Sequence, residues 1–177
     1  MKRSEQGFTL VEIMIVVAII ALLAAIAIPN VLRGRTSANE AAAIGNSRAL
    51  ISSFEMFRSV NNAYPLAATY QAQMYGVTPA FGPPSFNPTP ATALTAFLVQ
   101  GFNYTYTNNV PAAATYDLLA VPATVGTTGT RSFYTNESGQ IRHCRENNPA
   151  TATAANGRLP SANWVTIDAA LLAGNCN

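Results

Sequence analysis

A chain of 177 residues is long enough for one domain with a modest core and too short for two large ones. Only 10% of the residues are charged and 49% are hydrophobic, many of these being alanines or lying near the N-terminus. The formal net charge of +2 is too small to favour a nucleic-acid-binding protein, so nucleic acid is not an expected partner.

An apolar segment without a charged residue runs from Ile13 to Leu32. It is close to the roughly 20 residues that a helix needs to span a bilayer. Lys2 and Arg3 precede it and predict a cytoplasmic N-terminus. Glu12 lies just inside the apolar region, where a carboxylate at the bilayer centre would cost on the order of 2.5–3.5 kcal/mol. Glu12 therefore needs a partner or a position near the membrane surface.

Two general interpretations of this segment explain Glu12 poorly. A secretory signal peptide would use Ala25-Ile26-Ala27 as its cleavage site, but its apolar core would then be too long and would contain an acid. A plain N-terminal membrane anchor accounts for the hydrophobicity and leaves Glu12 without a role.

A third interpretation takes Gly7-Phe8-Thr9-Leu10-Val11-Glu12 as a unit. This stretch closely resembles the processing site of type IV prepilins and pseudopilins, and the likeness continues through "IMIVVAIIALLAAIAIPN". Pro29 stands where pilins carry a helix-kinking proline, whereas Ala21 replaces the glycine of many relatives. The resemblance implies that residues 1–7 are a leader, that a prepilin peptidase cuts after Gly7, and that it methylates the new amino group of Phe8.

The resemblance also implies a role for Glu12 in assembly. Cleavage creates a positively charged amine at Phe8, and methylation keeps that charge. In a filament of packed helices, Glu12 of one subunit is expected to pair with the Phe8 amine of its neighbour. Because an unpaired buried charge is costly, such pairing would fix the axial register of the subunits.

After Pro29 the sequence predicts that the helix continues to about Val60. A single helix from about Phe8 to Val60 would be roughly 80 Å long. In its second half, Leu50, Ile51, Phe54 and Phe57 fall at helical spacing and predict one apolar face. Residues 8–32 are therefore expected to form a transmembrane and assembly helix. Residues 33–177 are expected to form a periplasmic or extracellular head, and Asn61-Asn62 is expected to end the helix.

Beyond the helix the chain predicts a loop, a short helix and several strands. Residues 78–90 are rich in proline and glycine and predict a surface loop, and residues 91–101 predict a short helix ending at Gly101. Alternating aromatics predict a strand over 102–107, residues 115–123 predict a second, and residues 131–143 predict a hairpin turning at 136–139. The expected fold class is α+β, with an antiparallel sheet of three to four strands laid on the apolar face of the helix, as in the pilin fold.

Cys144 and Cys176 are the only cysteines. In an exported chain they predict one disulfide that closes a C-terminal loop, with free thiols as the alternative. The loop resembles the disulfide-bounded C-terminal loop of many type IVa pilins. Trp164 inside it is expected to be a packing anchor.

No catalytic, metal or cofactor site is expected. His143 and Cys144 are adjacent, so on a strand their side chains point to opposite faces and cannot form a nucleophile–base pair. Two cysteines and one histidine do not supply a zinc site. The calcium-binding loop of some major pseudopilins has no residue-by-residue match here.

The sequence therefore predicts a structural subunit of a type IV pilus filament. The resemblance implies an inner-membrane stage in lipid, then assembly with copies of itself by a platform protein and an assembly ATPase into a cell-surface fibre. One alternative is a pseudopilin of a type II secretion system, in a periplasmic pseudopilus. Another is a minor pilin that acts as an adhesion or DNA-binding module, for which Arg142, Arg145 and Arg158 are the nearest basic cluster.

Overall fold

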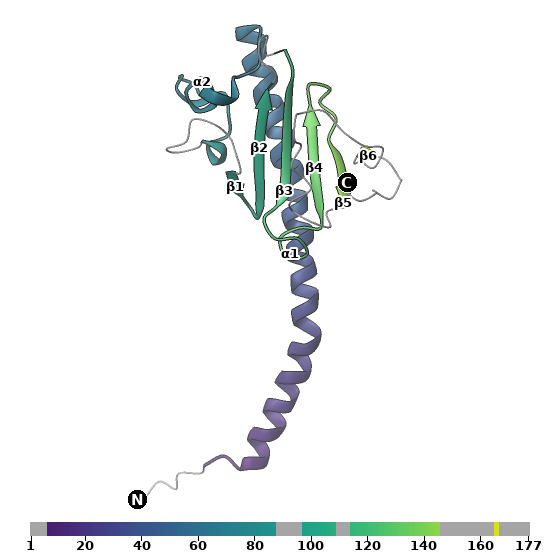
Figure 1. The fold of residues 1–177 in the computed structure, drawn as a ribbon. Helices are drawn as coiled ribbons and strands as arrows, with labels where there is room; N and C mark the ends of the chain where they lie inside the picture. Colours follow the sequence, from purple (N-terminus) through teal and green to yellow (C-terminus); the bar gives the residue numbers. More distant parts are fainter. Residues whose placement is uncertain (1–6, 88–96, 109–113, 146–164, 167–177) are drawn as a thin grey trace, which may run out of the picture. The chain divides into compact units, whose positions relative to one another are not determined.

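The computed structural model describes residues 7–87, 97–108, 114–145 and 165–166. Its longest element is the helix α1, which runs without a break from Leu10 to Asn61 (Figure 1). The chain divides into two compact units, Met1–Arg35 and Thr36–Asn177, and α1 contributes residues to each. Pro29 lies inside α1, so the helix passes through this residue; the predicted kink stays a prediction.

The part of α1 that belongs to the second unit buries one face. Its buried residues recur at intervals of three and four, which is the pattern of an amphipathic helix. The predicted apolar face is confirmed, because Leu50, Phe54 and Phe57 are buried and Ile51 is partly buried. Asn62 ends the helix in the left-handed conformation (φ 55°), and its N–H donates to the carbonyl of Arg58 at 2.8 Å.

Three short helical elements follow α1. They are the 3₁₀ helix η1 (Ala67–Thr69), the helix α2 (Tyr70–Tyr75) and the 3₁₀ helix η2 (Pro84–Phe86). Within the segment predicted as a surface loop, residues 78–90, the described part packs more closely against the core than expected. Phe86 is fully buried, and the centroid of its ring lies 4.7 Å from that of Tyr104. The aromatic residues in this proline-rich stretch thus anchor it to the core.

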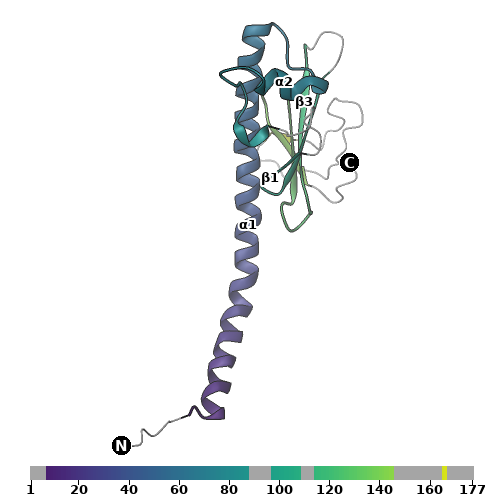
Figure 2. The ribbon, with the colours of Figure 1, turned by 90° about the vertical axis from the view of Figure 1, so that its left-hand side faces the viewer.

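An antiparallel sheet forms the other layer of the second unit. Its strands are β1 (Phe97–Val99), β2 (Phe102–Asn108), β3 (Tyr116–Pro122), β4 (Arg131–Asn136), β5 (Arg142–Arg145) and β6 (Val165–Thr166). They lie side by side in chain order, each antiparallel to the next. The sheet therefore has more strands than the three to four predicted. Figure 2 shows it alongside the C-terminal half of α1.

The first hairpin corrects one prediction. Residues 97–99 form strand β1, not the end of a short helix, and residues 91–96 of that predicted helix lie outside the described part of the chain. Gln100 and Gly101 both have positive φ (48° and 80°), as the central residues of a two-residue type I′ hairpin turn do. Val99 then pairs with Phe102, so the turn joins β1 directly to β2.

The core between sheet and helix is aromatic. Phe102, Tyr104 and Tyr106 alternate along β2 and are all fully buried, as the sequence pattern predicted. The ring of Phe54 on α1 lies 4.8 Å from that of Tyr106 and 5.0 Å from that of Tyr116. Tilted and edge-on aromatic pairs of this kind add about 0.5–1.5 kcal/mol each beyond the area that they bury.

Candidate functional site

The predicted cleavage bond lies just ahead of α1. Gly7, Phe8 and Thr9 have no regular secondary structure, and α1 begins at Leu10. All three are exposed, and the side chain of Phe8 is 85% exposed. A peptidase needs backbone that is not committed to helical hydrogen bonds, and the Gly7–Phe8 bond meets that requirement. Residues 1–6 of the predicted leader lie outside the described part of the chain.

Glu12 and Thr9 form a reciprocal cap on the first turn of α1. The backbone N–H and the hydroxyl of Thr9 both donate to Oε2 of Glu12, at 2.7 and 2.8 Å. In return the N–H of Glu12 donates to Oγ1 of Thr9 at 3.3 Å. The carbonyl of Thr9 accepts from the N–H of Ile13 at 3.3 Å, so Thr9 is the N-cap residue. This arrangement is the capping box.

The capping box gives Glu12 a partner within its own chain. The sequence signal was visible as Thr9-Leu10-Val11-Glu12, the S/T-x-x-E pattern, although the sequence-based interpretation considered only the Phe8 amine as a partner of Glu12. Every atom of the box belongs to Thr9 or Glu12, so a cut after Gly7 leaves it intact. The hydrogen bonds from Thr9 use Oε2, and the other carboxylate oxygen of Glu12, Oε1, takes part in none of the three.

The first part of α1 presents an apolar surface. Every large apolar side chain from Leu10 to Leu32 is at least 50% exposed, and these side chains occur on all sides of the helix. Among the described residues, α1 is the one helix long and apolar enough to cross a membrane, by length and composition. So much exposed apolar surface is covered in a stable protein by lipid or by other protein.

A buried carboxylate ties α1 to the sheet. Glu40 is only 6% exposed, accepts three hydrogen bonds from Thr130 and Arg131, and also forms an ion pair with Arg131, at the point where β4 begins. Its Oε1 accepts from the N–H and hydroxyl of Thr130 at 2.7 and 2.8 Å. Its Oε2 accepts from Nε of Arg131 at 2.8 Å, and Nη2 of Arg131 lies 2.8 Å from the same oxygen in the ion pair. This contact joins positions about ninety residues apart in the chain, and no sequence motif marked it.

Neighbouring polar contacts extend this attachment towards the start of the second unit. Thr36 donates from Oγ1 to the carbonyl of Thr127 at 3.3 Å, and Asn39 donates from Nδ2 to the carbonyl of Thr128 at 3.1 Å. The turn that links β3 to β4 is thus held by three residues of α1, which are Thr36, Asn39 and Glu40. These bonds begin at Thr36, the first residue of the second unit.

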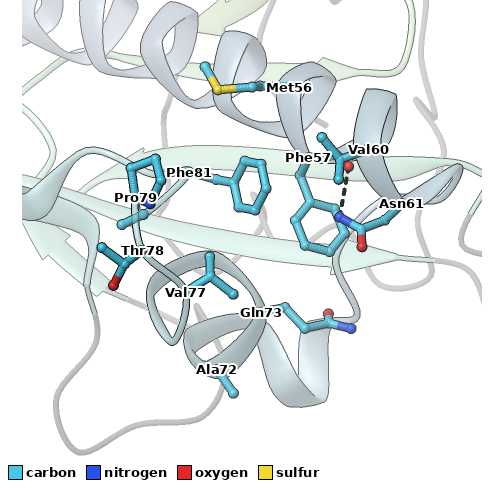
Figure 3. A pocket seen from close by; sticks show the side chains of 11 residues that line it. Met56, Phe57, Val60, Asn61, Ala72, Gln73, Val77, Thr78, Pro79 and Phe81 are labelled. Carbon is cyan, nitrogen blue, oxygen red and sulfur yellow. Dashed lines mark hydrogen bonds between the residues drawn. The ribbon is translucent and has the colours of Figure 1, made fainter.

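An apolar pocket of about 620 Å³ lies at the C-terminal end of α1 (Figure 3). Met56, Phe57 and Val60 line one side, and residues 77–81 line the other. The rings of Phe57 and Phe81, which both line it, meet edge to face with their centroids 5.2 Å apart. Most of the residues that line it are apolar, so the pocket is better suited to contact with an apolar group than to catalysis.

The cysteine and histidine of β5 are both buried. Cys144 is fully buried and is not a free thiol, which supports the predicted disulfide. Its expected partner Cys176 lies outside the described residues, as do Trp164 and Arg158, so the pairing stays a prediction. Burial and the nearby Arg131 guanidinium lower the pKa of His143, against a smaller opposing effect of Glu40. In the described part of the chain, no group of three or more His, Cys, Asp or Glu side chains is placed to hold a metal ion.

Comparison with known proteins identifies the N-terminal segment. Residues 2–28 match the family model "Prokaryotic N-terminal methylation motif". The chain is 44% identical over 62 residues to the type IV wide pilus major component PilA4 of Thermus thermophilus, covering 35% of this chain and 47% of that protein. It is 36% identical over 64 residues to the type II secretion system core protein G of Aeromonas hydrophila, covering 36% of this chain and 45% of that protein.

A further relative is the type II secretion system core protein G of Pseudomonas aeruginosa, 39% identical over 64 residues. The match covers 36% of this chain and 45% of that protein, so the chain spans less than half the length of the relatives that it matches. No solved structure matches the chain. The methylation motif, the similarity of the N-terminal segment to a type IV pilin and to type II secretion core G proteins, and the α+β architecture all agree with the resemblance to type IV pilins and pseudopilins.

Proposed function

We propose that this chain is a structural subunit of a type IV pilus filament, held in the bacterial inner membrane by α1 until it is assembled. The observation that carries the proposal is the exposed apolar surface of α1 from Leu10 to Leu32, which begins directly after an accessible Gly7–Phe8 bond. Lipid covers this surface before assembly, and the equivalent helices of other copies cover it afterwards.

Processing follows from the N-terminal segment. A prepilin peptidase cuts after Gly7, removes the leader 1–7 with its basic residues, and methylates the amine of Phe8. The capping box supports this order of events, because it fixes the start of α1 with atoms that all remain after the cut. The mature chain therefore begins with two residues outside a helix whose first turn is already satisfied.

Assembly depends on the charge of Glu12. In the filament its Oε1 atom pairs with the Phe8 amine of a neighbouring subunit, while Oε2 stays in the capping box. The pairing fixes the axial register, because a subunit displaced along the fibre would bury both charges without partners. An inner-membrane platform protein and an assembly ATPase drive the extraction from lipid. The Cys144–Cys176 disulfide closes a C-terminal loop on the exported head.

A type II secretion pseudopilin is the second candidate. It is favoured by the relatives from Aeromonas hydrophila and Pseudomonas aeruginosa, which are core G proteins of that system. The same N-terminal mechanism serves both, and they differ in whether the fibre reaches the cell surface. Shearing intact cells separates the two: a pilus subunit appears in the sheared fraction in quantity, whereas a periplasmic pseudopilus stays with the cells. A trace amount in the sheared fraction would instead indicate a minor pilin.

The role of Glu12 can be tested with variants that separate its charge from its capping. Glutamine also occupies the acidic position of a capping box, so Glu12→Gln keeps the cap and removes the charge. Thr9→Ala removes the cap and keeps the charge. We expect Glu12→Gln to lower the sheared fibre about tenfold or more, corresponding to about 1.4 kcal/mol or more per subunit. We expect Thr9→Ala to lower it far less.

Two results would contradict this proposal. Normal fibres from Glu12→Gln would show that the charge is not required. An N-terminus at Ile28, found by mass spectrometry in place of methylated Phe8, would support cleavage of a secretory signal peptide. Both variants should still be inserted and cleaved, which immunoblots of membrane fractions can check.

A further inference from the structure

The first charged residues after the apolar stretch of α1 are Arg33 and Arg35. Both are exposed. The ion pairs among the described residues are Arg58–Glu55 and Arg131–Glu40, so neither Arg33 nor Arg35 belongs to one. The acids of α1 are already engaged, because Glu12 accepts from Thr9, Glu40 from Arg131, and Glu55 from the hydroxyl of Tyr64.

The two arginines point to opposite sides of the helix at nearly the same height. At 3.6 residues per turn, residues two apart are separated by about 200° around the axis and about 3 Å along it. A protein partner that docks on one face of a helix contacts residues three or four apart. Arg33 and Arg35 therefore suit a partner that surrounds the helix at one level, and a layer of lipid headgroups does this around a membrane-spanning helix.

The length of the apolar stretch brings the arginines to that layer. From Leu10 to Leu32 the helix rises about 33 Å at about 1.5 Å per residue, and the hydrocarbon core of a bilayer is about 30 Å thick. With the capped end of α1 at one surface, Arg33 and Arg35 reach the opposite one. Their aliphatic stems can lie along apolar surface while the guanidinium groups meet phosphate oxygens, which they bind in a bidentate manner.

We propose that Arg33 and Arg35 bind the phosphate groups of membrane phospholipids and hold the C-terminal end of the span at the membrane surface before assembly. The inference rests on the membrane-anchored stage of the proposed function. Cleavage after Gly7 removes Lys2 and Arg3, and Arg33 and Arg35 are then the basic residues that flank the apolar stretch. Processing thus removes the basic side chains at the N-terminal end of the span and leaves those at its C-terminal end.

The test is a distance measurement between arginine and lipid. The mature chain cleaved after Gly7, which lacks Arg3 and carries ¹³C at the arginine Cζ atoms, is reconstituted into vesicles of phosphatidylethanolamine and phosphatidylglycerol in phosphate-free buffer. Solid-state NMR then measures the dephasing of Cζ by the lipid ³¹P nuclei. We expect strong dephasing in the wild type and loss of most of it in the double variant Arg33→Gln, Arg35→Gln. The control is Arg48→Gln, which removes another exposed arginine of α1 about 20 Å further along the helix and should leave the dephasing unchanged.

The outcomes separate this inference from the proposed function. Flotation with vesicles shows whether α1 anchors the chain, and a wild type that does not float overturns both. A wild type that floats but has the same dephasing as the double variant overturns the inference alone. Arginine–carboxylate contacts between copies without ³¹P dephasing would also overturn it, and would assign the two residues to the filament interface.

Discussion

The two halves of α1 differ in how their apolar side chains are distributed around the helix and in what buries them. From Leu10 to Leu32 the large apolar side chains point in all directions and stay exposed. From Thr36 onwards the buried residues form one stripe against the sheet. The first half depends for its burial on lipid or on other copies, whereas the second half is stabilised within its own chain. The difference shows that apolar content alone does not indicate what a helix packs against; the angular distribution of apolar residues does.

The largest expected effect is a difference in the free energy of unfolding between substitutions in the two halves of α1. Phe54→Ala should lower the free energy of unfolding of the second unit by about 3–5 kcal/mol, because it removes a fully buried ring from an aromatic cluster. Ile20→Ala, in the exposed apolar half, should change it by less than about 0.5 kcal/mol. Urea unfolding in detergent, followed by near-UV circular dichroism, measures both. Equal effects would mean that the two halves are not stabilised independently.

A smaller effect compares two acids on the C-terminal half of α1. Glu40→Gln should cost about 1–3 kcal/mol, because Glu40 is buried and receives charge-assisted bonds from Arg131. Glu55→Gln, at an exposed pair with 3.7 Å between charged atoms, should cost less than about 1 kcal/mol. Thermal unfolding of the matched variants tests this. A larger loss from Glu55→Gln would contradict the importance of the Glu40 contact.

The start of the apolar half should respond to loss of its cap. Thr9→Ala should destabilise the first turn of α1 by about 1 kcal/mol, since it removes the hydroxyl that Glu12 bonds. Thr9→Ser keeps a capping hydroxyl and serves as the control. Hydrogen exchange at the amides of Glu12 and Ile13 in detergent should be about fivefold faster in Thr9→Ala. Unchanged exchange would show that the capping box does not stabilise this turn.

The smallest expected effect is a pH dependence confined to the second unit. Burial and Arg131 lower the pKa of His143 in the folded state. The unfolded chain therefore takes up this proton first, and His143 should reduce stability as the pH falls below about 6.5. His143→Gln should flatten the fall in melting temperature between pH 7 and pH 5. An unchanged slope would assign the pH dependence to other groups.

The sequence predicted most where a regular pattern met a recognisable motif. It predicted α1 to within two residues at each end, the alternating burial of β2 and the hairpin of β4 and β5. It missed β1, because Phe97-Leu98-Val99 follows an alanine-containing stretch that was assigned to a helix, and the Gln100-Gly101 turn that defines the hairpin needs positive φ. It also missed the Glu40 contact, since no local pattern shows which distant donors a buried carboxylate will meet.

At the N-terminus, the sequence-based account of one predicted site residue was incomplete. Gly7, Phe8 and Glu12 are exposed at the start of α1, and their roles in cleavage, methylation and assembly stay predictions. The family resemblance directed attention to a partner of Glu12 on another subunit and away from Thr9, three residues upstream. Local capping patterns are readable in one chain, whereas pairing between chains is not.

The order of the strands has a consequence for how the second unit folds. Each strand pairs with its immediate neighbour in the chain, from β1 to β6, so no pairing has to wait for a distant segment. Strands that become available in chain order can therefore be added one at a time, each to the strand before it. Short loop closures of this kind favour rapid folding. An early sheet edge is covered by the next strand to arrive, which shortens the time during which it could pair with another chain.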